Sequence, residues 1–219
     1  MALHRSPSRT PRRFAAFAVL AALVGGVTFA HARSEPQDGT FASAASVAVT
    51  PVPTASPTKN SDNAAANALW DAIGRAEGMA KANLRLGLTE TTPGHSVYWG
   101  LTQTTPADQL RLLQAVFGEE SVLSAEARGH LRGLMGSVTA DQDWGISAGL
   151  DDSGSVHLKN GWLARSESGL WVVNSIGRVE ADGDTLLLAV LCDGQASQKA
   201  GISLVEDLAE RTRAAVTGG

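Results

Sequence analysis

The sequence predicts an α+β fold of layered helices and sheet, in which helical segments come first and an antiparallel meander with a closing helix comes last. The main observation is a change of pattern in the last third. There, residues 155–163, 170–180 and 185–193 are largely apolar segments separated by Ser/Gly and Asp-Gly turns, which is typical of strands. The second observation is that the preceding segments begin with helix-start signals. Sheets and helices bury their apolar faces against each other, so we expect layers around one core.

The N-terminal 32 residues have the composition of an export signal. Basic residues at 5, 9, 12 and 13 precede 17 uncharged, mostly apolar residues at 14–30, and Ala30-His31-Ala32 is a small-x-small cleavage site. We therefore expect 1–32 to be the signal peptide of an exported bacterial protein. The mature chain is expected to be secreted and to have no membrane span after cleavage. Residues 33–60 hold four of the eight prolines and predict a flexible linker.

The folded domain is expected over residues 61–219, with its first helix over about 63–75. Ser61 or Asp62 can cap this helix, because a side-chain oxygen at that position accepts hydrogen bonds from the first free backbone N–H groups. Gly and Pro residues then make 82–104 a predicted loop.

Two further helix starts follow. Thr105-Pro106 combines a cap with a proline at the first helical position, and Asp108 lies where a negative charge is favoured by the helix dipole. Ser124 can cap the next helix. These signals predict that two helices precede the sheet.

The predicted sheet ends in a strand that is apolar at every position from 186 to 191, which implies cover on both faces. Asp182-Gly183 predicts a tight hairpin turn before this strand. Ser203-x-x-Glu206 predicts a capping box for the closing helix. The inner side of that helix is expected to consist of Leu204, Val205, Leu208, Ala209 and Val216.

Composition excludes several classes of function. The chain has 18 Lys and Arg against 22 Asp and Glu, which argues against a nucleic-acid partner. None of its five histidines lies three to five positions from another, so we expect no metal site, and no cofactor is indicated. The one cysteine, Cys192, excludes an internal disulfide and is expected to be a small buried apolar residue.

Two motifs carry the functional prediction because they occur together. Ser61-Asp62-Asn63 opens the first helix, and Lys159-Asn160-Gly161 lies on the first strand of the meander, with Thr104-Thr105-Pro106 between them. In this order and context the chain resembles the class A serine β-lactamases and the penicillin-binding DD-peptidases, whose signatures are S-x-x-K, S-D-N and K-T-G. The resemblance covers about residues 60–219 and implies a β-lactamase/transpeptidase-like layered fold.

The resemblance also implies roles for these residues in acyl transfer. Ser61 would pass a proton to the leaving nitrogen, Asn63 would contact the ligand amide, and Lys159 would attract an anionic substrate. Asn160 and Gly161 would complete substrate binding, although Asn160 replaces the usual Thr and lacks its hydroxyl. The implied partner is a β-lactam or a peptidoglycan stem peptide.

The nucleophile of the family is out of place. The S-x-x-K motif here is Ser56-Pro57-Thr58-Lys59, and only four residues separate Ser56 from Ser61, so no buried helix fits between them. Lys59 on a solvated linker would stay protonated and could not serve as a base. We therefore expect no covalent labelling by penicillin. Of the two serines, Ser61 is a less favoured candidate nucleophile than Ser56.

Two other family features are in question. The two strands that the family places before its nucleophile have no counterpart in 33–55, so 61–219 is expected to be a partial domain with an exposed strand edge that favours association. Glu90 lies sixteen residues before Pro106, about where class A enzymes hold a deacylating glutamate. The pattern around it is missing, and we interpret it as an exposed loop residue.

Three functions fit these observations. The chain can be an exported serine β-lactamase-type hydrolase that is impaired or inactive, a non-catalytic relative that holds penicillin or cell-wall peptide, or the product of an internally deleted gene. Genomic DNA around codons 33–60 separates the last from the others. An in-frame sequence there that encodes two strands and a helical S-x-x-K would restore the enzyme interpretation.

Overall fold

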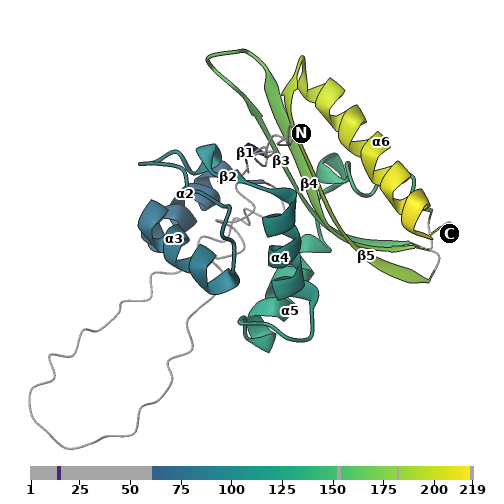
Figure 1. Cartoon of the computed structure of the whole chain (residues 1–219), viewed down its shortest axis with the longest axis horizontal. Coiled ribbons are helices and arrows are strands. Elements are labelled where there is room, and N and C mark those ends of the chain that lie inside the picture. The colour runs from purple at the N-terminus through teal and green to yellow at the C-terminus, as the bar shows by residue number, and fades with distance from the viewer. Residues whose placement is uncertain (1–13, 16–60, 152–153, 182, 218–219) are drawn as a thin grey trace, which may run out of the picture.

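The computed structural model describes residues 14–15, 61–151, 154–181 and 183–217. The expected signal peptide, apart from residues 14–15, and the expected linker with Ser56 and Lys59 lie outside the described residues. Its helices and strands, in chain order (Figure 1), are β1 (Phe14–Ala15), α2 (Asn63–Ala72), α3 (Arg75–Leu86), η1 (Trp99–Leu101), β2 (Gln103–Thr104), α4 (Pro106–Phe117), α5 (Ala125–Met135), η2 (Ala140–Gln142), β3 (Ser155–Ala164), β4 (Trp171–Ala181), β5 (Asp184–Gln195) and α6 (Gln198–Thr217).

The main sheet is the predicted three-stranded antiparallel meander. Its strand order is β3-β4-β5, with Lys159 opposite Ile176 and Glu180 opposite Thr185. Gly183, in the turn between β4 and β5, has φ 87°, a conformation that glycine adopts without strain. The sequence thus predicts both the topology and the position of this turn. A second, two-stranded pairing joins β1 to β2.

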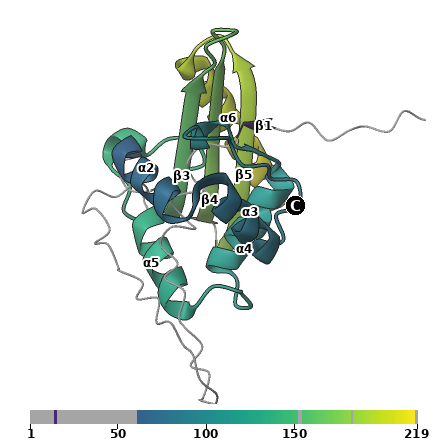
Figure 2. The ribbon, with the colours of Figure 1, turned by 90° about the vertical axis from the view of Figure 1, so that its left-hand side faces the viewer.

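Helices cover both faces of the sheet. In Figures 1 and 2, α6 lies on one side and α2 to α5 lie on the other. The larger core, on the α2–α5 side, contains Trp70, Leu113, Met135 and Ile176, and a smaller core on the α6 side contains Ile146, Leu158 and Val179. The α+β layered fold is therefore confirmed.

The edge strand β5 is covered on both faces, as its apolar sequence predicts. Leu187, Ala189 and Leu191 pack against the larger core, and Leu188 packs against the α6 side. These side chains are buried or half-buried. Among the described residues, no strand pairs with the outer edge of β5.

The predicted caps form at three helices. Asp62 accepts hydrogen bonds from the N–H groups of Ala64 and Ala65, Thr105 accepts from Asp108, and Ser124 accepts from Ala127. Capping therefore fixes where α2, α4 and α5 begin. This matters most at α2, because its start carries the first functional motif.

The prediction of a loop over 82–104 is wrong at its N-terminal end. The first helix stops at Ala72 because Gly74 has φ 84°, and α3 then continues to Leu86, where Gly87 at φ 70° ends it. Gly78 inside α3 allows close contact with the end of α2, since an added Cβ would lie 1.5 Å from Ile73 O.

The predicted start of the closing helix is also wrong. The helix α6 begins at Gln198, and the Ser197 hydroxyl accepts the Ala200 N–H at 3.1 Å, so Ser203 lies within the helix and caps nothing. Its buried stripe runs at four-residue spacing through Gly201, Val205, Ala209 and Arg213. Leu204, Leu208 and Val216, expected on the inner side, are exposed.

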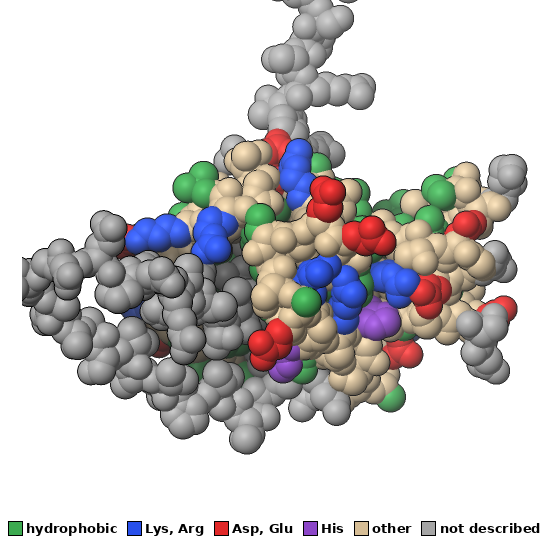
Figure 3. All heavy atoms as spheres, turned by 90° about the horizontal axis from the view of Figure 1, so that it is seen from below, with side chains coloured by type: hydrophobic (Ala, Val, Ile, Leu, Met, Phe, Trp, Pro, Cys, Tyr) green, Lys and Arg blue, Asp and Glu red, His purple; other side chains and the backbone are tan. Residues whose placement is uncertain are grey.

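Cys192 is buried, as predicted. Its thiol donates to Val173 O at 3.0 Å, and burial raises its pKa. Within the described part of the chain, no helix is both long and apolar enough to cross a bilayer. Figure 3 shows basic and acidic side chains interspersed over the described part of one face, without a block of a single sign.

Candidate active site

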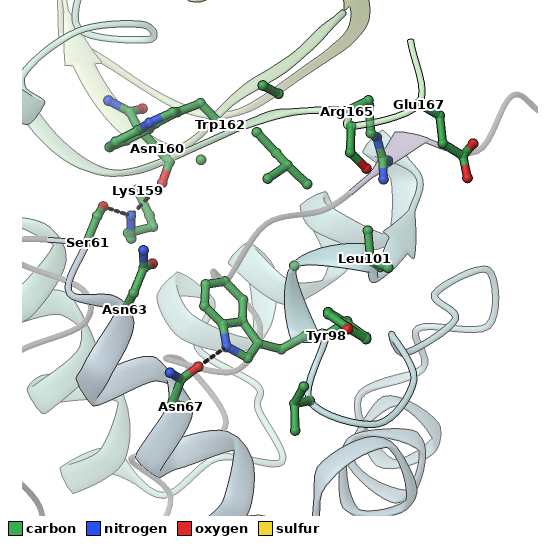
Figure 4. Close-up of a pocket in the computed structure, with 17 residues that line it drawn as sticks. Ser61, Asn63, Asn67, Tyr98, Leu101, Lys159, Asn160, Trp162, Arg165 and Glu167 are labelled. Atoms are coloured by element: carbon green, nitrogen blue, oxygen red, sulfur yellow. Dashed lines mark hydrogen bonds between the residues drawn. The ribbon is translucent and has the colours of Figure 1, made fainter. Parts of the chain in front are cut away.

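A cavity of about 940 Å³ lies between the start of α2, residues 97–101 and the second half of β3 with the turn after it (Figure 4). It brings together four of the residues that the two sequence motifs single out, Ser61, Asn63, Lys159 and Gly161, and the backbone of a fifth, Asn160. The motifs that are about a hundred residues apart in sequence therefore meet in one place.

Ser61 is held in an uncommon backbone conformation at the entry to α2. Its φ is 49°, in the left-handed region that a non-glycine residue adopts only when its surroundings enforce it. The Asp62 cap fixes the following residues, and the Ser61 hydroxyl donates to Gln142 Oε1 at 3.1 Å. The side chain is thereby directed toward β3, as Figure 4 shows.

Lys159 contacts Ser61 directly. Its Nζ donates to Ser61 Oγ at 2.5 Å and to Asn160 O at 2.5 Å. The residue is only 2% exposed, and burial lowers the pKa of its amine from 10.5 to about 8. No ion pair compensates this burial among the described residues. An appreciable fraction of the amine is therefore neutral near pH 8.

The edge of β3 presents backbone groups to the cavity. Asn160 O faces the site, because it accepts the Lys159 amine, and β3 is an edge strand of its sheet. Backbone N–H and C=O groups of alternate residues point to the same side of a strand. The N–H of Trp162, two residues on and also lining the cavity, therefore faces the same way and can donate to a ligand.

The side chain of Asn160 does not take the ligand-contacting position that the sequence predicts. It lies on the opposite face of β3, where Nδ2 donates to Gln142 O at 2.7 Å and Trp144 O at 3.0 Å. Strand alternation already places Asn160 on the face away from Lys159. The residue contributes its backbone to the cavity, and its side chain attaches the 142–144 segment to the strand.

Gln142 is a site residue that sequence reasoning missed. It accepts the Ser61 hydroxyl through its side chain, while its own backbone carbonyl accepts Asn160. It thus links the two motifs. No spacing rule identifies it, since its role depends on the tertiary contact between 142–144 and β3.

The wall opposite β3 is aromatic and amide-rich. Trp99 Nε1 donates to Asn67 Oδ1 at 2.6 Å, and Tyr98 lies beside them on the cavity. Asn67 follows Asn63 by one helical turn on α2, so both amides lie along the same side of the cavity (Figure 4). These groups are suited to contacting a ligand that has both apolar and amide portions.

Glu90 does not line this cavity. Its Oε2 accepts the Thr105 hydroxyl at 3.3 Å, and its backbone N–H donates to Asp108 at 2.9 Å. The residue therefore supports the start of α4. Among the described residues, no three His, Cys, Asp or Glu side chains gather closely enough to hold a metal ion.

The sequence model of the Beta-lactamase enzyme family matches residues 54–216. No curated protein sequence matches the chain. Among solved structures, PBP-A is similar with a TM-score of 0.63 and 21% identity over 75% of this chain and 60% of that one. One PBP-A mutant structure is an acyl-enzyme complex with penicillin G.

Two class A β-lactamase structures are also similar. One is from Bacteroides cellulosilyticus, with TM-score 0.59 and 19% identity over 71% of this chain and 60% of that one. The other is a variant of the class A β-lactamase of the last common ancestor of Gram-negative bacteria, with TM-score 0.68 and 21% identity over 94% of this chain and 85% of that one. At these identities the likeness shows the fold. The chain spans about 60% of the length of PBP-A and of the Bacteroides enzyme.

Proposed function

The chain belongs to the Beta-lactamase enzyme family, and on that premise we propose that it is an exported protein whose cavity binds β-lactams, with impaired serine acyl transfer. The observation that carries the proposal is the meeting of Ser61, Asn63, Lys159 and Gly161 in one cavity. Its volume of about 940 Å³ is within the range of sites for drug-sized molecules.

The charges and donors of the cavity match the chemistry of a β-lactam. Lys159 is mostly protonated at pH 7, since the pKa of its amine is about 8, and attracts the carboxylate that penicillins carry. The Trp162 N–H is available for the lactam carbonyl oxygen. Asn63 offers an amide beside them. Donors that are already oriented stabilise an oxyanion more strongly than solvent does.

Impairment follows from the position of the family's nucleophile motif. Ser56 and Lys59 belong to a proline-rich segment only a few residues before Ser61. A serine without a packed helix beneath it loses the effective concentration that positioning provides, of order 10⁵ M or more. We therefore infer that turnover through Ser56 is far below that of an enzyme with an intact central helix.

Noncovalent capture of a peptidoglycan stem peptide is the second candidate. The open edge of β3 favours it, because an extended peptide can pair with a free strand edge by main-chain hydrogen bonds. Both candidate ligands are assigned to the same cavity. A stem peptide should therefore compete with penicillin for binding, and the absence of competition would indicate two separate sites.

Equilibrium binding of penicillin G to the full chain tests the proposal. Lys159→Met should weaken binding at least tenfold, because the variant removes the buried cation at the cavity. Lys199→Met is the matched control, since Lys199 is an exposed lysine on α6 that does not line the cavity. Equal affinity in all three proteins, or no binding to the parent, would contradict the proposal.

A further inference from the structure

We propose that Ser61 itself accepts the acyl group in this chain, and that Lys159 is the base that takes its proton. The inference rests on the proposed function, in that the cavity must bind a β-lactam. It differs from the mechanism that the family's motifs imply, where the S-x-x-K serine is acylated and the S-D-N serine passes a proton.

The first support is geometric. A serine hydroxyl becomes a useful nucleophile when a base lies within hydrogen-bond reach, and Lys159 Nζ lies 2.5 Å from Ser61 Oγ. The other side-chain partner of Ser61 among the described residues is Gln142, whose amide cannot take a proton. Lys159 is therefore the base in place.

The second support is that the Ser61 backbone is held in one conformation while its side chain is accessible from the cavity. It lines the cavity, and its φ of 49° is maintained by the capped start of α2. Strained conformations of this kind are concentrated at functional sites. A fixed hydroxyl keeps the effective concentration that positioning provides.

The third support is the environment of the amine. Burial favours the neutral form of Lys159 and brings its pKa to about 8, close to the range where a general base works best. A neutral amine can accept the Ser61 proton through its lone pair while one N–H still donates to Asn160 O. The hydroxyl needs only to rotate from Gln142 toward Lys159.

The step balances with groups present in the cavity. The neutral Lys159 amine takes the Ser61 hydroxyl proton as Oγ bonds to the lactam carbonyl carbon, with the developing oxyanion facing the Trp162 N–H. The carbon–nitrogen bond of the lactam then breaks, and the ring nitrogen receives the proton from the Lys159 ammonium. The product is a ring-opened ester on Ser61, and Lys159 is neutral again.

The test uses the full chain with penicillin G, read by intact mass and by peptide mapping. We expect one adduct with the mass of penicillin, located on Ser61. Its rate of formation should rise about tenfold per pH unit below pH 8 and level off above. Ser61→Gly should abolish it, and glycine is chosen because it accepts φ 49° without strain. Ser137→Ala, at an exposed serine that does not line the cavity, should label as the parent does.

Lys159→Arg separates the base from the charge. The guanidinium keeps the positive charge and hence penicillin binding, but it does not deprotonate, so acylation at pH 9 should fall at least a hundredfold. An adduct on another residue, or a rate that does not change between pH 6 and 9, would overturn the inference. Binding without any adduct overturns this inference and leaves the proposed function standing, whereas absence of binding overturns both.

Discussion

The side-chain nitrogen of Lys159 lies 2.5 Å from the hydroxyl oxygen of Ser61, across 98 positions of sequence. This contact joins the start of α2 to β3 and buries a lysine that has no carboxylate partner among the described residues. Burial of an uncompensated amine costs stability when it is protonated. Functional sites are where such costs are expected.

The first prediction concerns the pH dependence of stability. The Lys159 amine has a folded-state pKa of about 8, below its usual 10.5, so the unfolded state binds more protons between these values. The free energy of unfolding should therefore rise with pH from about 8 to 10.5. Lys159→Met should remove this dependence and stabilise the protein by up to about 3 kcal/mol at pH 7.

Urea unfolding at pH 7, 8, 9 and 10 measures this difference, with Lys199→Met as the exposed control. The difference in unfolding free energy between the parent and Lys159→Met should become smaller as the pH rises. The unfolding free energy of Lys199→Met should follow that of the parent at every pH. A difference in unfolding free energy that stays constant from pH 7 to 10 would show that the pKa of the Lys159 amine is not lowered in the folded state.

The second prediction concerns Asp108, a fully buried carboxylate at the start of α4. It accepts the Glu90 N–H at 2.9 Å, the Thr91 hydroxyl at 2.7 Å and Arg111 at 2.7 Å. Asp108→Ala removes the buried acceptor that these donors share and should lower the free energy of unfolding by about 3 kcal/mol.

The matched control is Asp71→Ala, which removes an exposed ion pair between the end of α2 and Arg75 at the start of α3 and should cost less than about 0.5 kcal/mol. Chemical denaturation of both variants gives the comparison. Similar losses in the two variants would mean that the buried network around Asp108 contributes no more than a surface pair.

The third prediction compares two glycines. A Cβ at Gly177 in β4 would lie 2.0 Å from His157 O and 2.9 Å from Leu158 Cα, so Gly177→Ala should separate β3 from β4 and cost more than about 2 kcal/mol. A Cβ at Gly133 in α5 meets nothing within 4 Å. Gly133→Ala should therefore stabilise the helix by about 0.5–1 kcal/mol. Thermal melts in which both variants shift in the same direction would contradict this contrast.

The elements that the sequence predicts well are those with local signals. The three strands have apolar patterns and a glycine turn, and the caps at Asp62, Thr105 and Ser124 each form within three residues. In contrast, α3 begins after Gly74 with no side-chain cap and buries only Met79 and Asn83, so it lacks the start signal that marks the other helices.

The start of α6 and the details of the site were missed for related reasons. Ser197 and Ser203 are both plausible caps by sequence, and only packing against β4 and β5 decides between them. In the site, the motifs identify Ser61 and Lys159, and strand alternation predicts that the Asn160 side chain points away from Lys159. The role of Gln142 arises from a tertiary contact that no local pattern encodes.

The fourth prediction concerns export, which follows from the basic residues, the uncharged stretch and Ala30-His31-Ala32. Protein secreted by a bacterial host that expresses the full chain should begin at Arg33. Mass spectrometry of the N-terminal peptide measures this directly, with Ala32→Arg as the matched variant that should block cleavage. A secreted chain that still begins at Met1 would refute the assignment of a cleaved signal.

Acylation of Ser61 is tested most directly by a gel of the purified full chain incubated with a fluorescent penicillin at pH 9. The sequence alone predicts no band, because Ser56 is unsupported, whereas the contact between Ser61 and Lys159 predicts a slowly forming band. This band should be lost in Ser61→Gly and Lys159→Arg and should persist in Ser56→Ala. A band lost only in Ser56→Ala, or no band from a parent chain that binds penicillin, would contradict it.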